Sequence, residues 1–204
     1  MNKIIQVKPI SDRFYITWYL TTRCNYDCMY CPEEFHNNKT RQKTLEELKK
    51  IWHDIVQKTE NTYNEYQISF TGGEITTNKN FILFIEWIKT QTQLTYLYVT
   101  SNGSADINYY KTLLTYINGL SLSIHSEHIN EKKFFEKAIA LHKICFMTKK
   151  DFYVNVMNEF WNQERIPKYE KILSKYHIPF SINEIDYTTK TRENPIIKGK
   201  LNLE

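Results

Sequence analysis

The sequence is poor in the residues and patterns that mark several classes of protein. Glycine and proline number only five each and the net charge is +4, which excludes collagen-like and charge-driven disordered chains. The longest apolar run, residues 81–85, ends at Glu86, far below the roughly 20 residues that span a bilayer. The first residues contain one positive charge and no apolar segment of signal-peptide length, so export is not expected. We therefore expect a globular, cytoplasmic protein with no membrane span.

The sequence does contain enough apolar material for one hydrophobic core. Of its 204 residues, 41% are hydrophobic, including 15 Tyr, 11 Phe and 4 Trp, and a chain of this length builds one substantial domain. We expect this domain over residues 1–187, with a core at about 14–185, followed by a polar tail at 188–204. The 27 basic and 23 acidic residues lack the excess of positive charge typical of nucleic-acid-binding proteins, so nucleic acid is not an expected partner.

Short runs with a period of two residues alternate along the chain with longer runs of helical period. This alternation is typical of successive βα units and a parallel sheet. A complete barrel of eight such units takes about 250 residues, so the sequence predicts an α/β fold in the form of a partial (β/α)6 TIM-like barrel of parallel strands. The expected strands are 16–21, 65–71, 94–100, 119–125, 152–158 and 180–185. The expected helices begin at a capping box formed by Thr44 and Glu47, and continue at 79–90, 105–117, 131–143 and 166–176.

Apolar and polar side chains alternate strictly in the expected strands. Parallel sheets that are covered on both faces normally have near-continuous hydrophobic strands. If the apolar side chains, on one face of the sheet, pack on the helices, then the polar side chains on the other face line a hydrogen-bonding interior. The alternative is an antiparallel sheet with one solvated face, which the helical patterns disfavour. The polar set is Tyr19, Gln67, Ser69, Tyr98, Ser121, Ser123, His125, Tyr153 and Asn155, and the apolar set is Trp18, Ile68, Phe70, Val99, Leu122, Ile124, Val154 and Val156. From the polar set, His125, Gln67 and Tyr19 are the candidates for catalytic contact with a substrate.

Three of the four cysteines follow the first expected strand in a C-x3-C-x2-C arrangement: Cys24, Cys28 and Cys31. In a cytoplasmic chain this clustering indicates metal ligation. A structural zinc ion needs four protein ligands, and His36 is the nearby candidate for the fourth. A 4Fe–4S cluster on three cysteines leaves one iron open to a substrate or cofactor, and the spacing favours this cluster. Cys145 precedes the fifth strand and is expected to be a buried structural thiol.

A second motif, Gly72-Gly73-Glu74, ends the second expected strand. Parallel sheets build their sites at the carboxyl ends of their strands. Glycine allows the backbone to approach a ligand closely, and a carboxylate at this place can bind an ammonium group. Alone the motif is a weak signal, because turns between strands and helices often contain glycine. Together with the cysteine motif it is a strong one.

These motifs make the chain resemble the radical S-adenosylmethionine (SAM) superfamily over roughly residues 14–185. The resemblance rests on Thr21 to Asn25, Cys28, Tyr30 and Cys31, on Gly72 to Glu74, and on residues 100–103; residues 154–159 match the glycine motif of the fifth strand poorly. It implies that Cys24, Cys28 and Cys31 bind a 4Fe–4S cluster and that SAM chelates the open iron. It also implies SAM contacts from Tyr30, Gly72, Gly73, Glu74, Ser101, Asn102, Ser123 and Asn155.

The resemblance further implies reductive cleavage of SAM and abstraction of a hydrogen atom from a small-molecule or peptide substrate. An external one-electron donor of flavodoxin or ferredoxin type is then needed, because one remaining cysteine cannot hold a second cluster. We expect a short form without the cysteine-rich C-terminal extension of many peptide-modifying members. Its length resembles that of glycyl-radical activating enzymes, so such an enzyme, acting on a partner protein, is the alternative function within the family. The alternative from another class is a non-catalytic zinc or iron–sulfur module that contacts RNA through Lys190, Arg192, Lys198 and Lys200.

Overall fold

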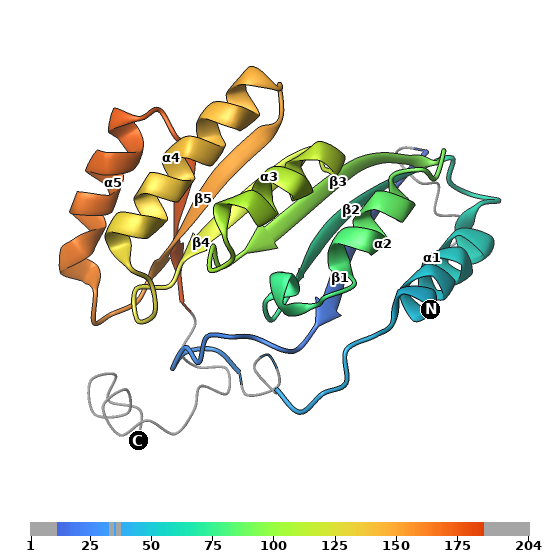
Figure 1. Ribbon diagram of the computed structural model, residues 1–204, viewed down its shortest axis with the longest axis horizontal. Coiled ribbons are helices and arrows are strands. Elements are labelled where there is room, and N and C mark those ends of the chain that lie inside the picture. Colours follow the sequence, from blue (N-terminus) through green and yellow to red (C-terminus); the bar gives the residue numbers. More distant parts are fainter. Residues whose placement is uncertain (1–11, 33–34, 36–37, 186–204) are drawn as a thin grey trace, which may run out of the picture.

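A computed structural model describes residues 12–32, 35 and 38–185 of the protein (Figure 1). Six parallel strands form one sheet in the spatial order β1-β2-β3-β4-β5-β6, the same as their order in the sequence. Strands β1 and β6 are therefore the two edges, and the sheet does not close within the described residues. The predicted α/β fold with a partial (β/α)6 barrel is confirmed. The strands are β1 (Arg13–Thr21), β2 (Glu65–Gly72), β3 (Leu94–Ser101), β4 (Gly119–Ile124), β5 (Asp151–Asn158) and β6 (Phe180–Glu184).

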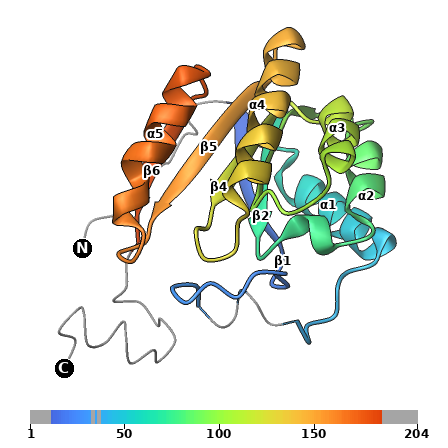
Figure 2. The ribbon, with the colours of Figure 1, turned by 60° about the vertical axis from the view of Figure 1, so that its left-hand side comes forward.

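The helices connect consecutive strands and lie together on one face of the sheet (Figures 1 and 2). The capping box predicted at Thr44 is present, since Thr44 Oγ1 accepts from the Glu47 amide and the Glu47 carboxylate accepts from the Thr44 amide. The helices are α1 (Leu45–Thr59), α2 (Phe81–Ile88), α3 (Ile107–Tyr116), α4 (Glu131–Met147) and α5 (Ile166–Lys175), with short 3-10 turns η2 (Ile75–Thr77) before α2 and η3 (Gln163–Arg165) before α5.

Two boundaries differ from the sequence-based expectation in ways that matter for the site. Helix α4 continues four residues past Lys143, because Leu141 and Cys145 extend its buried stripe by one turn. Strand β4 ends at Ile124, so His125 belongs to the loop that follows it. The predicted tail at 188–204, with its four basic residues, and His36 lie outside the described residues.

The hydrophobic core lies between the sheet and the helices. All eight members of the predicted apolar set are at most 8% exposed. Phe70 on β2 illustrates the packing, with ring centroids 5.5 Å from Trp18, 5.6 Å from Phe81 and 5.9 Å from Phe84. Side chains of opposite parity point to the other face of a strand. The register therefore places the predicted polar set on the inner face, as expected, except for His125, which lies in the loop after β4.

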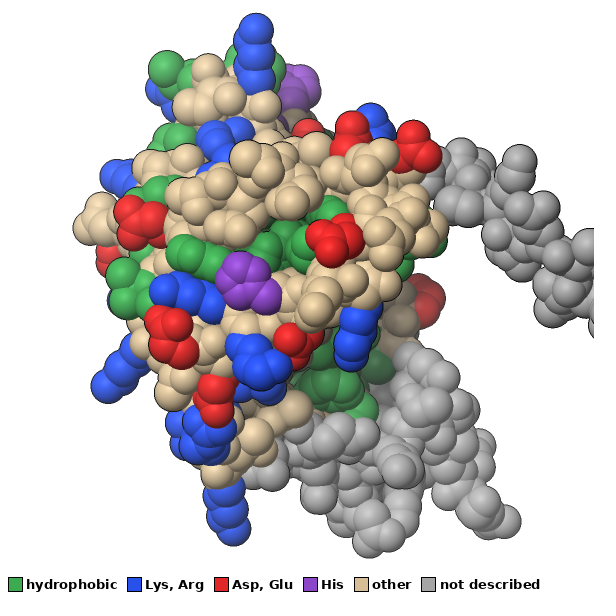
Figure 3. Space-filling view, turned by 90° about the vertical axis from the view of Figure 1, so that its right-hand side faces the viewer, with side chains coloured by type: hydrophobic (Ala, Val, Ile, Leu, Met, Phe, Trp, Pro, Cys, Tyr) green, Lys and Arg blue, Asp and Glu red, His purple; other side chains and the backbone are tan. Residues whose placement is uncertain are grey.

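The outer surface of the described residues carries charges of both signs. Figure 3 shows Lys and Arg side chains interspersed with Asp and Glu on one side of the molecule. Several of the charged side chains on the helices are paired, as in Lys50 with Asp54 at 2.6 Å and Lys168 with Glu131 at 2.5 Å. Within the described part of the chain, no helix has the length and apolar character needed to cross a membrane.

Candidate functional site

A cavity of about 200 Å³ lies between residues 22–32, here called the cysteine loop, and the carboxyl ends of the strands. The loop follows β1 and runs beneath these strand ends in both ribbon views (Figures 1 and 2). Cys24, Cys28 and Cys31 all line the cavity. Of the predicted SAM-binding residues, the lining includes Tyr30, Gly72, Gly73, Ser101, Asn102 and Ser123.

The thiols lie in an environment that disfavours free thiolates. Burial raises the pKa of both Cys24 and Cys28. No Lys or Arg is among the described residues that line the cavity, so the positive charge that thiolates need must come from a bound cation. Buried and half-buried thiols that open onto one cavity, with no Lys or Arg among its described lining residues, thus fit an iron-containing group.

The arrangement fits a 4Fe–4S cluster better than a zinc ion. Zinc requires its ligands at about 2.0–2.3 Å from one centre. Among the described residues, no three Cys, His, Asp or Glu side chains converge as ligands of a single ion. In a 4Fe–4S cluster each thiolate binds its own iron, so three thiols around a common cavity suffice. Cys145, in contrast, is fully buried in the core on α4, as predicted.

Backbone hydrogen bonds connect the carboxyl end of β2 to the beginning of the cysteine loop. The amides of Gly73 and Glu74 donate to the carbonyls of Thr21 and Arg23 at 2.8 and 2.6 Å. A Cβ atom at Gly72 would lie 2.3 Å from the Thr21 carbonyl oxygen, and one at Gly73 would lie 2.2 Å from that of Arg23. Gly72 also has φ +133°, a conformation that side chains rarely adopt. Only glycines allow this close approach.

The Glu74 side chain is not among the residues that line the cavity. Its carboxylate is 0% exposed and accepts from the Asn102 amide at 2.7 Å, Ser101 Oγ at 2.9 Å and the Thr76 amide at 3.0 Å. Burial raises its pKa, while these donors act in the opposite direction. The contact between this carboxylate and a ligand stays a prediction. In the structure its oxygens are bound by donors after β2 and β3, and Gly72 and Gly73 line the cavity.

The carboxyl end of β3 holds the middle of the cysteine loop through Asn102. Its side-chain Nδ2 donates to Asn25 Oδ1 at 3.0 Å and lies 3.9 Å from Cys24 Sγ. Its backbone amide binds Glu74. Asn102 therefore connects the β2 and β3 ends with the first cysteine.

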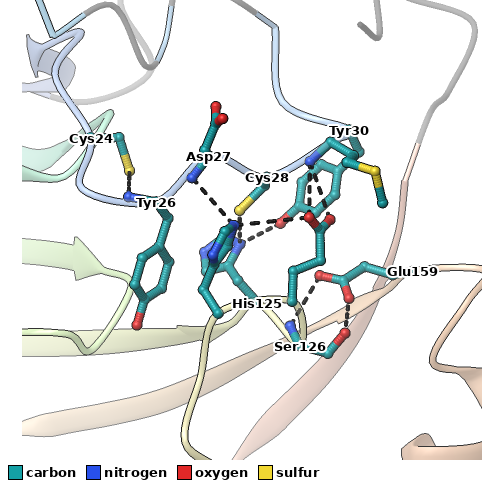
Figure 4. Close-up of polar contacts among 11 residues, drawn as sticks. Cys24, Tyr26, Asp27, Cys28, Tyr30, His125, Ser126 and Glu159 are labelled. Atoms are coloured by element: carbon teal, nitrogen blue, oxygen red, sulfur yellow. Dashed lines mark hydrogen bonds and ion pairs between the residues drawn. The ribbon is translucent and has the colours of Figure 1, made fainter. Parts of the chain in front are cut away.

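The loop after β4 holds the remainder of the cysteine loop (Figure 4). The Asp27 amide donates to His128 Nε2 at 3.3 Å, and the Met29 amide donates to the Glu127 carboxylate at 3.2 Å. The ring of Tyr26 stacks on His128 with centroids 4.8 Å apart. Sequence reasoning did not assign Glu127 and His128 to the site. Their position directly after a parallel strand was the signal that could have identified them.

Glu159, at the end of β5, holds the loop after β4 in turn. Its buried carboxylate accepts from the amide of Ser126 at 3.1 Å and from the Ser126 hydroxyl (Figure 4). Burial is the main cause that raises the pKa of Glu159 to about 7. Four successive strand ends, β2 to β5, are thus linked to the cysteine loop directly or through one neighbour.

His125 is the predicted catalytic candidate that the structure brings to the cavity. Its Nδ1 lies 3.6 Å from Cys28 Sγ and contacts the Tyr30 hydroxyl, and the two rings are nearly parallel (Figure 4). Burial lowers its pKa to about 4, with a smaller effect of His128, so the imidazole is neutral near pH 7.

Three other predicted residues lie on the inner face but outside this cavity. Tyr19 is 60% exposed and packs near Phe35. Gln67 lies four residues before Thr71 on β2, which is roughly 13 Å at the rise of a strand. Asn155 on β5 accepts from Ser181 and Asn183 on β6, at 3.5 and 3.4 Å. Strand parity thus identified the face correctly, whereas the position along each strand decides which residues reach the cavity.

Comparisons with known proteins agree with this geometry. The sequence model of the Radical SAM superfamily matches residues 18–160. Over 90 residues, which are 44% of this chain, the sequence is 32% identical to GTP 3',8-cyclase of Haemophilus influenzae strain PittEE. The chain covers only 26% of the length of that relative.

Two solved structures share the fold. The structure of anSMEcpe with bound AdoMet has a TM-score of 0.60 and 16% identity, over 85% of this chain and 50% of that one. The structure of Streptococcus suis SuiB bound to the precursor peptide SuiA has a TM-score of 0.59 and 19% identity, over 92% of this chain and 44% of that one. At these identities the likeness concerns the fold alone.

The buried carboxylate of Glu74 allows a direct test of its role. Glu74→Gln replaces one acceptor oxygen by a donor that faces the donors of residues 76, 101 and 102, so we expect a loss of about 1–3 kcal/mol in the free energy of unfolding. Urea denaturation measures this loss, with Glu136→Gln on the exposed face of α4 as the neutral control. Unchanged stability, with ligand affinity alone reduced, would show that the carboxylate faces the cavity.

The contact between Glu127 and the cysteine loop is testable by hydrogen exchange. Glu127→Ala removes the acceptor of the Met29 amide, and a hydrogen bond to a charged group contributes about 1.5–3 kcal/mol. We expect amide exchange within residues 26–31 to accelerate about tenfold or more, as measured by mass spectrometry under anaerobic, reducing conditions. Glu136→Ala is the control. Equal exchange rates in both variants would show that this contact does not stabilise the conformation of the loop.

Proposed function

Because this chain belongs to the radical SAM superfamily, we propose that it binds a 4Fe–4S cluster through Cys24, Cys28 and Cys31 and binds SAM beside it. The observation that carries the proposal is that all three thiols and the Gly72–Gly73 backbone open onto one uncharged cavity. When bound, these cofactors would supply the reductive cleavage of SAM and the removal of a hydrogen atom from a substrate. The remaining tasks belong to the protein, which binds and orients the reactants.

The cavity wall offers SAM both backbone and side-chain contacts. Gly72 and Gly73 expose their backbone to the cavity, where no side chain intervenes, and we assign them to the methionyl part of SAM. The nearly parallel rings of Tyr30 and His125, with centroids 6.1 Å apart, form an aromatic wall suited to the adenine. Ser123 adds a hydroxyl on the β4 side.

We assign positioning roles to three other predicted residues. The hydroxyl of Ser101 and the amide group of Asn102 are engaged by Glu74, Asn25 and their neighbours. Together with Glu74 they fix the β2 and β3 ends against the cysteine loop, and their effect on SAM would pass through the placement of Gly72 and Gly73. Asn155, outside the cavity lining, receives no SAM contact in this assignment.

The reaction requires an electron from outside the described site. The fourth cysteine of these 204 residues, Cys145, is 0% exposed within the core, so these residues supply the ligands of one cluster only. An external donor of flavodoxin or ferredoxin type is therefore part of the proposal. The substrate class is a small molecule or a peptide. The SuiB structure contains a precursor peptide, and this supports the peptide alternative by analogy.

Cluster ligation is tested by replacing each cysteine in turn. We expect Cys24→Ala, Cys28→Ala and Cys31→Ala each to lose the cluster after anaerobic reconstitution, because each removes the ligand of one iron. Cys145→Ala is the matched control and should retain about four irons per chain. Iron and sulfide analysis together with the visible absorbance gives the readout. Full iron content in Cys28→Ala, or one zinc per colourless wild-type chain, would refute the assignment.

A further inference from the structure

A second cavity, of about 210 Å³, lies on the inner face of the sheet and is separate from the cysteine cavity. The register arranges its inward-facing side chains in two rows across β1, β2 and β3. We call this site the inner-face groove. Its rows are Tyr15, Gln67 and Tyr96, followed by Thr17, Ser69 and Tyr98.

The groove lies close to the proposed reaction site along the same strands. From Ser69 and Tyr98, the next inward-facing residues are Thr71 and Thr100, which line the cysteine cavity. Two residues of a strand span roughly 7 Å, and four span roughly 13 Å. A ligand that reaches from the groove to the cysteine cavity therefore needs the length of two to four extended residues.

The two tyrosines of β3 are held in fixed positions. Their rings are nearly parallel, with an interplanar angle of 10° and centroids 6.5 Å apart. The Tyr96 hydroxyl donates to the carboxylate of Asp151 at the start of β5. A Cβ atom on Gly119 would lie 2.4 Å from the Tyr98 ring, so this ring occupies space that only glycine leaves free. The pair is thus set in place before any ligand arrives, which lowers the entropic cost of binding.

The groove combines aromatic surface with uncharged hydrogen-bonding groups. None of its six inward-facing side chains carries a charge near pH 7, and no Lys or Arg is among the described residues that line either cavity. Among the described residues, these two sites offer no Lys or Arg to the phosphates of a nucleoside triphosphate. Tyrosine rings together with hydroxyls and the Gln67 amide are suited to an uncharged aromatic group bearing polar functions.

The edge position of β1 favours a chain molecule over a compact ligand. Among the described strands, β1 pairs only with β2, and Tyr15 on its inner face is 65% exposed. Within the described residues no further strand covers this edge, so a ligand in the groove can extend past β1. A peptide has this form, and its aromatic side chain and the backbone around it match the aromatic and polar parts of the lining.

On the basis of the function proposed above, we propose that the inner-face groove binds an uncharged aromatic side chain of a peptide substrate, two to four residues from the residue that reacts. The tyrosine pair of β3 contacts the ring, and Gln67 and Ser69 bind the adjacent peptide groups. These residues determine specificity and take no part in the chemical step.

The first test measures binding to the full chain without SAM, both with and without a reconstituted cluster. The probes are N-acetyl-tryptophan amide, N-acetyl-leucine amide and GTP, and ligand-observed NMR measures the binding of each. We expect the tryptophan probe to bind best, and Tyr98→Leu to weaken it about three- to tenfold. Tyr98→Phe retains the ring and should retain most of the affinity, and Tyr176→Leu, at an exposed tyrosine of the α5 end, is the control.

The second test locates the probe on the wild-type chain and does not depend on the folding of a variant. A short peptide that contains benzoylphenylalanine is photo-crosslinked and mapped by mass spectrometry, with crosslinks expected at residues 15–17, 67–69 or 96–98. Crosslinks elsewhere, equal affinity for the leucine probe, or preferred binding of GTP would overturn the inference. Because neither measurement needs SAM or turnover, a chain that binds no cluster but binds the aromatic probe in the groove would refute only the proposed function.

Discussion

The hydrogen bonds between the cysteine loop and the carboxyl ends of the strands are the constraint on which the site depends. The loop has no regular secondary structure, so its polar groups are bound by neighbours. The Glu74 amide after β2 binds the Arg23 carbonyl, Asn102 after β3 binds the Asn25 side chain, and Glu127 after β4 binds the Met29 amide. These three positions lie together at the carboxyl ends of parallel strands. The register between the strands is fixed because every second residue is apolar and buried against the helices. The packing of the core thus determines where the thiols lie.

The electrostatics of the inner face follow from the same arrangement. Among the described residues, the three thiols and the neutral ring of His125 surround a cavity without a Lys or Arg side chain, and the buried carboxylate of Glu74 is bound by its own donors outside this lining. Such a site disfavours isolated negative charge and favours a ligand that brings cations. Farther along the same face the groove is uncharged as well. On the proposed function, the described part of the inner face would combine a place for iron with a substrate path that selects against polyanions.

The sequence predicted those features that depend on local pattern. The order of the elements, the capping box at Thr44 and the two faces of the sheet follow from periodicity, and the structure contains all three. Features that depend on contacts between distant segments were not accessible. The partners of Glu74 come from β3, and Glu127 and His128 lie about a hundred residues from the loop that they contact. The alternation of polar and apolar residues assigned Gln67 to the inner face. The distance of Gln67 from the cavity, however, depends on how the cysteine loop covers the strand ends.

Electron paramagnetic resonance of the anaerobically reconstituted and chemically reduced protein, recorded with and without SAM, tests the central claim most directly. The three loop cysteines leave one iron of a 4Fe–4S cluster without a protein ligand. We therefore predict a cluster signal that changes when SAM is added, and that changes in the same way in Cys145→Ala. A cluster signal that SAM leaves unaltered, or a protein that takes up zinc and shows no cluster signal, would contradict the account.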